Sequence, residues 1–225
     1  GGLPGFCYLR KESWYSQKME TLISTILDRD LRMVYPTTLD YPALRNFYAT
    51  LSFFQGQAID IAEISKLSGI SQITSKKLLA ALESLFLIRF LPILGDRKKR
   101  ILLFEDVGEV RHLNEERIKS EYIWLGALFA NLRVEFYNQS GSIVQFYQYK
   151  KRSGVFAPLV IKRGRKVWGF FFSGTENPSP KTLASVQTFK KEFPESVNFI
   201  LHNEKKIDLL NSSTAILPIY GIFNS

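Results

Sequence analysis

The alternation of apolar and polar positions is clearest between residues 59 and 104. A short helix is expected from Asp60, which with Glu63 resembles a capping box, to Gly69. Its apolar positions recur at helical spacing: Ile61, Ile64 and Leu67. Ser71 is suited to cap a second helix. The apolar face expected for that helix comprises Ile73, Leu78, Leu79, Leu82 and Leu85. The pattern predicts a helix-turn-helix.

Two β-rich runs, residues 87–94 and 101–104, follow the second helix, with Gly95, Asp96 and a basic run between them. This is the arrangement that a winged helix-turn-helix requires. Six cations are predicted to contact nucleic acid: Lys76, Lys77, Arg97, Lys98, Lys99 and Arg100. The second helix lacks arginine and asparagine for base readout, so little sequence preference is expected. A solvated basic turn is the alternative interpretation.

Two further helices precede this motif, one capped by Ser13 and extending to about Val34, the other starting at Asp40 and Pro42. In the first of them, Asp30 lies near the C-terminal end and is expected to pair with a neighbouring arginine. Residues 106–117 are charged and lack periodicity. We therefore expect a helical winged helix-turn-helix domain over residues 1–112 and a second domain over residues 118–225.

The second half predicts an α/β domain. It begins with six apolar residues on one helical face: Ile118, Tyr122, Leu125, Phe129, Leu132 and Phe136. The elements expected next are strands at 142–149, 155–161 and 166–173, a helix starting at Ser179 and Pro180, a strand at 197–201, and an apolar run at 215–220. We expect the apolar face of the first of these helices, which carries the six residues, to pack against the sheet.

The formal net charge is +9, and it is unevenly distributed. Residues 1–117 hold 16 Lys and Arg against 14 Asp and Glu, whereas residues 118–225 hold 14 against 7. Such an excess favours polyanions. One cysteine and two distant histidines exclude a disulfide framework and a zinc site, and no apolar run is long enough to span a bilayer. We expect a cytoplasmic protein without a membrane segment or cofactor.

Several strings together resemble one family. They are the opening Gly-Gly-Leu-Pro, Arg29-Asp30-Leu31, the winged helix-turn-helix and Asp106-Val107-Gly108. This order is similar to the region that follows the ATPase core in a group of prokaryotic AAA-type ATPases (DUF4143-like). The resemblance implies that the second domain has the PD-(D/E)XK nuclease-like fold. It also implies that the ATPase domain of the full-length chain is a partner. The phosphate-binding loop of the ATPase is absent from this chain.

The nuclease site implied by the resemblance is degenerate. A magnesium-dependent nuclease holds its metal with carboxylates. Ala130 and Ala157 occupy two of the expected acidic positions, and the third strand carries phenylalanines, including Phe170 and Phe172, where Glu and Lys are expected. We interpret the phenylalanine run as core and the remaining acids as solvated charges. No catalytic or metal-binding residue is assigned.

The hypothesis from the sequence is a noncatalytic C-terminal module of a AAA-type ATPase. In this hypothesis the winged helix contacts nucleic acid or a partner protein, and the nuclease-like domain is a scaffold. Two alternatives are a sequence-specific transcription regulator and an active metal-dependent nuclease with relocated acids.

Overall fold

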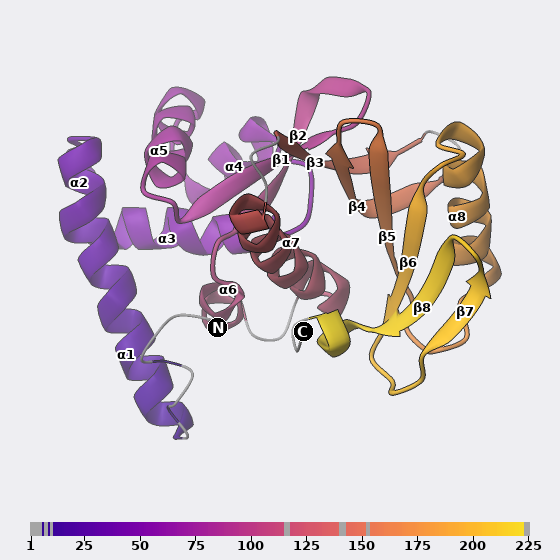
Figure 1. Cartoon of the computed structure of the whole chain (residues 1–225). Helices are drawn as coiled ribbons and strands as arrows, with labels where there is room; N and C mark the ends of the chain where they lie inside the picture. Colours follow the sequence, from indigo (N-terminus) through magenta and orange to yellow (C-terminus); the bar gives the residue numbers. More distant parts are fainter. Residues whose placement is uncertain are drawn as a thin grey trace. The chain divides into compact units, whose positions relative to one another are not determined.

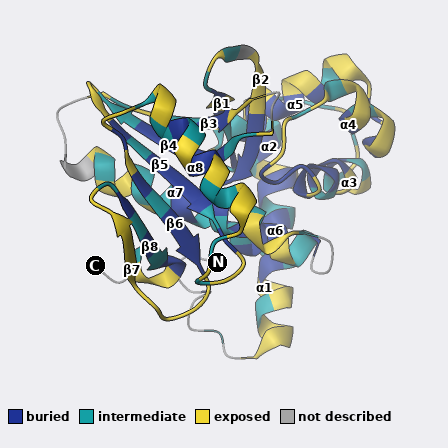
Figure 2. Cartoon of the chain, turned by 90° about the vertical axis from the view of Figure 1, so that its right-hand side faces the viewer, coloured by how far each residue is buried: buried dark blue, intermediate teal, exposed yellow. Residues whose placement is uncertain are grey.

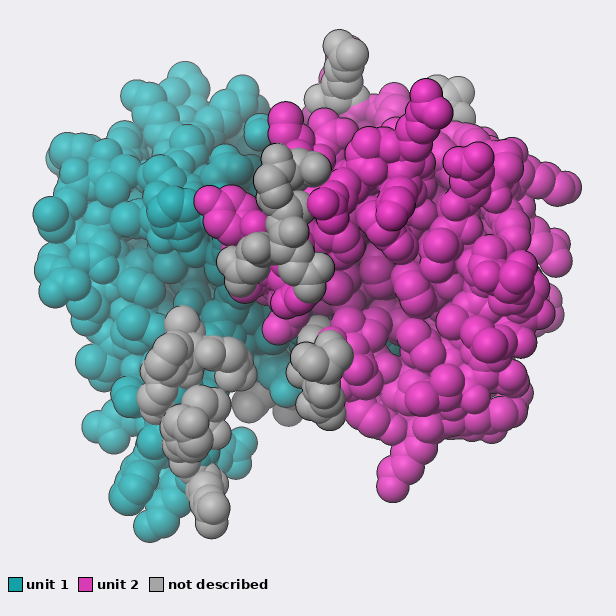
Figure 3. Space-filling view, in the orientation of Figure 1, with its two compact units in different colours: residues 1–90, 100–127 teal, residues 91–99, 128–225 magenta. Residues whose placement is uncertain are grey.

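The computed structural model describes residues 6, 9, 11–114, 118–139, 143–151 and 154–222, with the backbone alone at Arg97, Asn138 and Gln139. The opening Gly-Gly-Leu-Pro lies outside the described residues. The chain divides into two compact units, residues 1–90 with 100–127 and residues 91–99 with 128–225 (Figure 3). The division expected between residues 112 and 118 differs from these units.

Unit 1 is mainly helical (Figure 1). Its helices are α1 Glu12–Thr25, a π-helical turn Ile26–Asp30, α2 Leu31–Val34, α3 Tyr41–Ser52, α4 Ile61–Ser68, α5 Gln72–Ser84 and α6 Val107–Leu113, and α7 Ser120–Gln139 begins in it. The long helix predicted to reach Val34 is confirmed. The Ser13 cap is wrong, because Lys11 holds the N-cap position and makes no side-chain capping bond. Asp40 does cap α3, since it accepts the Ala43 N–H at 2.9 Å.

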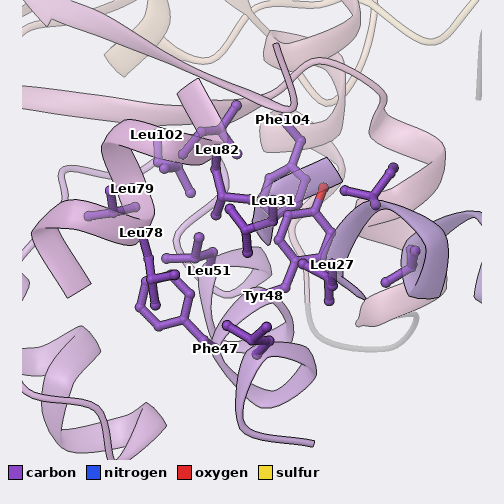
Figure 4. Close-up of a cluster of buried hydrophobic side chains, with 14 of the residues drawn as sticks. Leu27, Leu31, Phe47, Tyr48, Leu51, Leu78, Leu79, Leu82, Leu102 and Phe104 are labelled. Atoms are coloured by element: carbon purple, nitrogen blue, oxygen red, sulfur yellow. The ribbon is translucent and has the colours of Figure 1, made fainter. Parts of the chain in front are cut away.

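The core of unit 1 is built from α1 to α5 and from the two strands that follow them, which contribute Ile88, Leu102 and Phe104. Figure 4 shows its central side chains: Leu27, Leu31, Phe47, Tyr48, Leu51, Leu78, Leu79, Leu82, Leu102 and Phe104. The rings of Tyr48 and Phe104 lie 5.2 Å apart between centroids. The two helices ahead of the helix-turn-helix therefore complete the apolar core that α4 and α5 could not form alone.

Residues 106–113 correct one sequence prediction, since a segment expected to be irregular forms α6. Asp106 caps this helix by accepting the Gly108 N–H at 2.6 Å. Glu109 and Val110 are buried. A helix of 7 residues spans only about two turns, so it is too short to show apolar periodicity in the sequence.

The Gln55 side chain forms hydrogen bonds to two other segments of unit 1, at Phe104 and at Tyr122. Its Oε1 accepts the Phe104 N–H at 2.9 Å, and its Nε2 donates to the Tyr122 carbonyl at 3.1 Å. The next residue, Gly56, has φ +71°, and a Cβ there would lie 2.6 Å from the Tyr122 ring. These contacts join Tyr122 to unit 1, to which residues 120–127 belong, although the sequence assigned them to the second domain.

Unit 2 contains a mixed sheet. The strands within residues 128–225 are β3 Val144–Lys150, β4 Phe156–Arg163, β5 Lys166–Phe172, β6 Val197–His202, β7 Asp208–Asn211 and β8 Thr214–Pro218, with α8 Pro180–Glu192 between β5 and β6 in the sequence. The spatial order is β3-β4-β5-β6-β8-β7, in which β5-β6 and β6-β8 are parallel. The predicted order of helix, three strands, helix and strand is confirmed. The sequence missed β7, whose four residues are all exposed and show no apolar alternation.

Helices cover both faces of this sheet. Val186 and Phe189 of α8 pack on one face, in a cluster with Val160, Val167 and Phe171. On the other face, Phe129 of α7 contacts Phe146 edge to face, with ring centroids 5.5 Å apart. The strand interiors are buried between these helices (Figure 2). The fold class is thus mixed α/β, with a helical N-terminal part. Ile118, predicted on the α7 face, precedes the helix.

Candidate nucleic-acid interface

The turn between α4 and α5 is fixed by side-chain oxygens. Asp60 caps α4 by accepting the Ala62 N–H at 2.8 Å, and Ser71 caps α5 by accepting the Thr74 N–H at 3.2 Å. Gly69 ends α4 in the left-handed region with φ +74°, which glycine adopts without steric cost. The Ser65 hydroxyl donates to the Ile70 carbonyl at 2.6 Å. The predicted helix-turn-helix is confirmed.

Helix α5 separates a buried face from an exposed one. The buried positions are Ser75, Leu78, Leu79, Ala81 and Leu82. The exposed positions are Gln72, Ile73, Lys76, Lys77, Ala80 and Ser84. Ile73 was predicted to face inward but is 71% exposed. At about 100° per residue it lies almost opposite Leu82. Leu67 of α4, also assigned to the apolar face, is 53% exposed.

The wing is a hairpin of β1 Ile88–Ile93 and β2 Asp96–Phe104. Its turn is at Leu94 and Gly95, and Gly95 has φ +87°. The basic run expected in the connecting loop instead forms the start of β2, because β pairing extends to Asp96. Lys98, Lys99 and Arg100 are exposed. The side chain of Arg97 lies outside the described residues.

Asp96 organises the start of β2. Its Oδ1 accepts the N–H groups of Lys98 at 2.9 Å and Lys99 at 3.2 Å. These backbone hydrogen bonds lower the pKa of the Asp96 carboxyl, because they stabilise its charged form. Asp96 therefore contributes one negative charge beside the wing cations at neutral pH.

Phe86, Arg89 and Phe90 are features of the wing that sequence reasoning missed. Phe86 is exposed with φ +58°, a conformation that costs an L residue strain. The Arg89 guanidinium lies 4.7 Å from the Phe86 ring centroid and pairs with Glu105. Arg100 lies at the same distance over Phe90. The Arg89 charge is therefore partly neutralised. Arg89 lies three residues from Phe86, a spacing too common to have indicated a contact, whereas Arg100 and Phe90 lie on different strands, beyond any local pattern.

The predicted cations fall into both units. Lys76 and Lys77 lie on α5 and Arg100 on β2, all within unit 1, whereas Lys98 and Lys99 belong to unit 2. Within the described ranges, none of these five side chains forms an ion pair with a carboxylate. Their charge is thus available to a polyanion.

Two further basic clusters of the sequence, residues 150–152 and 162–166, lie in unit 2. Lys151 forms an ion pair with Glu192, which raises the pKa of the Lys151 ammonium. Arg152 lies outside the described residues. Residues 162–166 form the end of β4 and the turn into β5. The first cluster therefore has less uncompensated charge than its sequence suggests.

The positions of the implied nuclease site hold no ligand groups. Ala157 is buried in a cluster with Tyr149 and Phe171. Phe170 is also buried and stacks on Phe199, with ring centroids 5.1 Å apart. Ala130 lies half-buried on α7, and Phe172 is half-buried at the end of β5. The interpretation of the phenylalanine run as core is confirmed for Phe170 and Phe171. Across the part of the chain that the structure describes, no three His, Cys, Asp or Glu residues converge as metal ligands.

None of the helices in the described ranges is both long enough and apolar enough to span a bilayer.

Two solved structures have a weak likeness to this chain. RV1404 from Mycobacterium tuberculosis is 14% identical, with 57% of this chain and 79% of that chain covered and a TM-score of 0.26. A MarR-like transcriptional regulator from Thermotoga maritima is 16% identical, with 55% and 96% covered and a TM-score of 0.24. At such TM-scores the likeness gives no evidence about the fold or the function of this chain. Among curated proteins, none matches this chain significantly.

A family model matches residues 1–114. This range includes the helix-turn-helix, the wing and α6. It is just over half of the 225 residues. The chain therefore belongs to the DUF8612 family, which is described as a domain of unknown function.

Proposed function

We propose that the chain is a noncatalytic nucleic-acid-binding module whose winged helix-turn-helix holds duplex backbone with little sequence preference. The observation that supports this function is that the predicted cations with described side chains are exposed on each element: Lys76 and Lys77 on α5, and Lys98, Lys99 and Arg100 on β2. None of them is neutralised by a carboxylate within the described ranges. Cations of this kind bind phosphates and release counterions, which provides affinity independent of sequence.

The exposed face of α5 favours phosphate contact over base readout. Lys76 and Lys77 carry point charges on flexible stems, whereas arginine, asparagine and glutamine present planar groups that fix two hydrogen bonds to a base edge. Gln72 is the one such group on this face, at the first position of the helix. It supports the second candidate function, a sequence-specific regulator, because the first residues of a recognition helix are those that meet base edges.

Binding of a fluorescent duplex of about 20 base pairs, followed by anisotropy, tests the first function. The variant replaces Lys76, Lys77, Lys98, Lys99 and Arg100 by alanine. A matched control removes the same charge from exposed positions elsewhere: Arg111, Lys119, Lys181, Lys191 and Lys205. We expect the variant to bind at least about tenfold more weakly than the control, since each lost phosphate contact lowers affinity. Equal binding by variant and control would refute the proposal.

Competition with random and selected duplexes separates the two candidates. The nonspecific module predicts that unlabelled random duplex competes as well as any selected sequence. Strong preference for one sequence, lost on Gln72→Ala, would instead establish the regulator.

We further propose, on the family resemblance, that the second unit is a degenerate nuclease-like scaffold attached to a AAA-type ATPase. Ala130, Ala157 and Phe170 support this view, because none can bind a cation. Incubation with single- and double-stranded DNA and RNA in Mg²⁺ and in Mn²⁺ should leave the substrates intact. Cleavage that co-purifies with the protein and disappears in Glu135→Gln or Glu121→Gln would establish the active-nuclease alternative.

A further inference from the structure

Unit 2 contains a groove of about 960 Å³. The residues that line it are Phe136, Ile143, Arg163, Gly164, Arg165, Lys166 and Trp168. Four of these are consecutive and form the turn from β4 to β5. The groove therefore combines a cationic turn with an aromatic wall.

The turn geometry places the three cations together. Arg163 and Lys166 are paired across the hairpin, so the connection between them is only two residues long. Gly164 permits this tight turn, since it has φ +58°. Arg165 and Lys166 are exposed and Arg163 is half-buried. No described carboxylate forms an ion pair with any of the three. Within the described residues, no ion pair therefore offsets the positive charge of the turn.

Ring contacts within unit 2 fix the aromatic side chains of the groove in place. Trp168 lies two residues after Lys166 in β5, so both side chains project from the same face of the strand. The Trp168 ring packs against Phe136, with centroids 5.3 Å apart. Phe136 in turn meets Phe146 edge to face at 6.4 Å. Trp168 is nevertheless only half-buried, and Ile143 at the groove edge is 85% exposed. The indole is therefore fixed in place yet still accessible.

We propose that this groove binds single-stranded nucleic acid, with a base stacked on Trp168 and the backbone held by Arg163, Arg165 and Lys166. A cationic path beside an aromatic platform is the combination that binds single strands without sequence preference. Bases in a duplex are already stacked and paired, so their faces cannot reach the indole. Three cations also exceed what one phosphate needs, which favours an oligonucleotide over a mononucleotide. None of these residues belongs to the cations proposed to bind duplex.

Anisotropy of a labelled oligothymidine of about 12 nucleotides tests the proposal. The full chain is used with the five winged-helix cations replaced by alanine, so that only the groove contributes. Trp168→Ala should weaken binding about 5- to 150-fold, the range expected for one lost base stack, whereas Trp168→Phe should retain most of the affinity. Replacing Arg163, Arg165 and Lys166 by alanine should reduce the slope of log K against log salt by about 2.

The matched control replaces three exposed lysines that do not line the groove: Lys181, Lys191 and Lys205. The proposal requires this control to keep the original salt slope. Three results would overturn it: equal slopes for the two triple variants, duplex binding as tight as single-strand binding, or displacement by thymidine monophosphate at the same concentration as by the oligonucleotide. Circular dichroism identifies any variant that fails to fold, and Trp168→Phe then provides the comparison.

Discussion

The Tyr48 hydroxyl donates a hydrogen bond to Glu109 Oε2 in the interior of unit 1, where both side chains are buried. Burial raises the pKa of Glu109 to about 7, because the charged carboxylate is poorly solvated there. The same burial, together with the neighbouring Glu109, raises the pKa of the Tyr48 hydroxyl, which remains a donor. The core that supports the winged helix thus contains a group that titrates near neutral pH.

Stability should fall as pH rises through the pKa of Glu109. The folded state keeps its proton up to about pH 7, while the unfolded chain loses it near 4.5. The contribution of Glu109 to the free energy of unfolding is therefore fully present below pH 4.5 and is lost as the pH rises through about 7. We expect urea unfolding to show that wild type loses about 2 kcal/mol relative to Glu109→Gln between about pH 5 and about pH 8. Parallel pH profiles for the two proteins would contradict this, and Glu12→Gln is the exposed control.

Glu20 should have the opposite pH dependence. Its carboxylate accepts hydrogen bonds from Arg45 at 2.9 Å and lies 2.9 Å from His112 Nε2. The Arg45 hydrogen bond lowers the Glu20 pKa to about 2, with a smaller effect from His112. The contribution of Glu20 to the free energy of unfolding is present above pH 4.5 and is lost as the pH falls towards 2. Glu20→Gln should therefore flatten the acid side of the unfolding profile. An unchanged acid midpoint would show that this network does not stabilise the fold.

Phe129→Ala should destabilise the protein by about 3 to 5 kcal/mol. The side chain is buried on α7 and its ring packs against Phe146. Truncation removes apolar burial and leaves a cavity between helix and sheet. Urea unfolding measures the loss, with Val134→Ala on the exposed side of the same helix as control. A loss no larger than that of the control would mean that the α7 face is wrongly assigned.

Phe86→Gly should be more stable than Phe86→Ala by about 1 kcal/mol. Both variants lose the ring and its contact with Arg89, but only glycine accepts φ +58° without strain. The backbone bonds from Phe86 N–H to Glu83 and from Leu87 N–H to Leu82 hold the residue in this conformation. Equal thermal midpoints for the two variants would indicate that this residue is not strained.

Local signals made much of the fold predictable. Asp40, Asp60 and Ser71 are caps whose chemistry operates within three residues, and Gly69 ends a helix through its own backbone freedom. The strands β4 and β5 are buried enough to show as apolar runs. These features depend on neighbours in the sequence, so the sequence alone indicates them.

Features that depend on residues far apart in the sequence could not be predicted from local patterns. Gln55 is buried only because Phe104 and Tyr122 supply its hydrogen-bond partners. Ile73 is exposed because the face of α5 that packs against the core is the one with Leu78 and Leu82, and Ile73 lies on another face. The groove beside Trp168 combines α7, the residue before β3 and the β4-β5 turn, which are separated in sequence. No local pattern could have brought those residues together.

The salt dependence of duplex binding tests the central claim most directly. Wild type is compared with a variant in which Arg97, Lys98, Lys99 and Arg100 are replaced by alanine, over a series of salt concentrations. If each wing cation neutralises one phosphate, the slope of log K against log salt should fall by about 3 to 4. An unchanged slope would contradict the account, because the wing would then make no phosphate contacts.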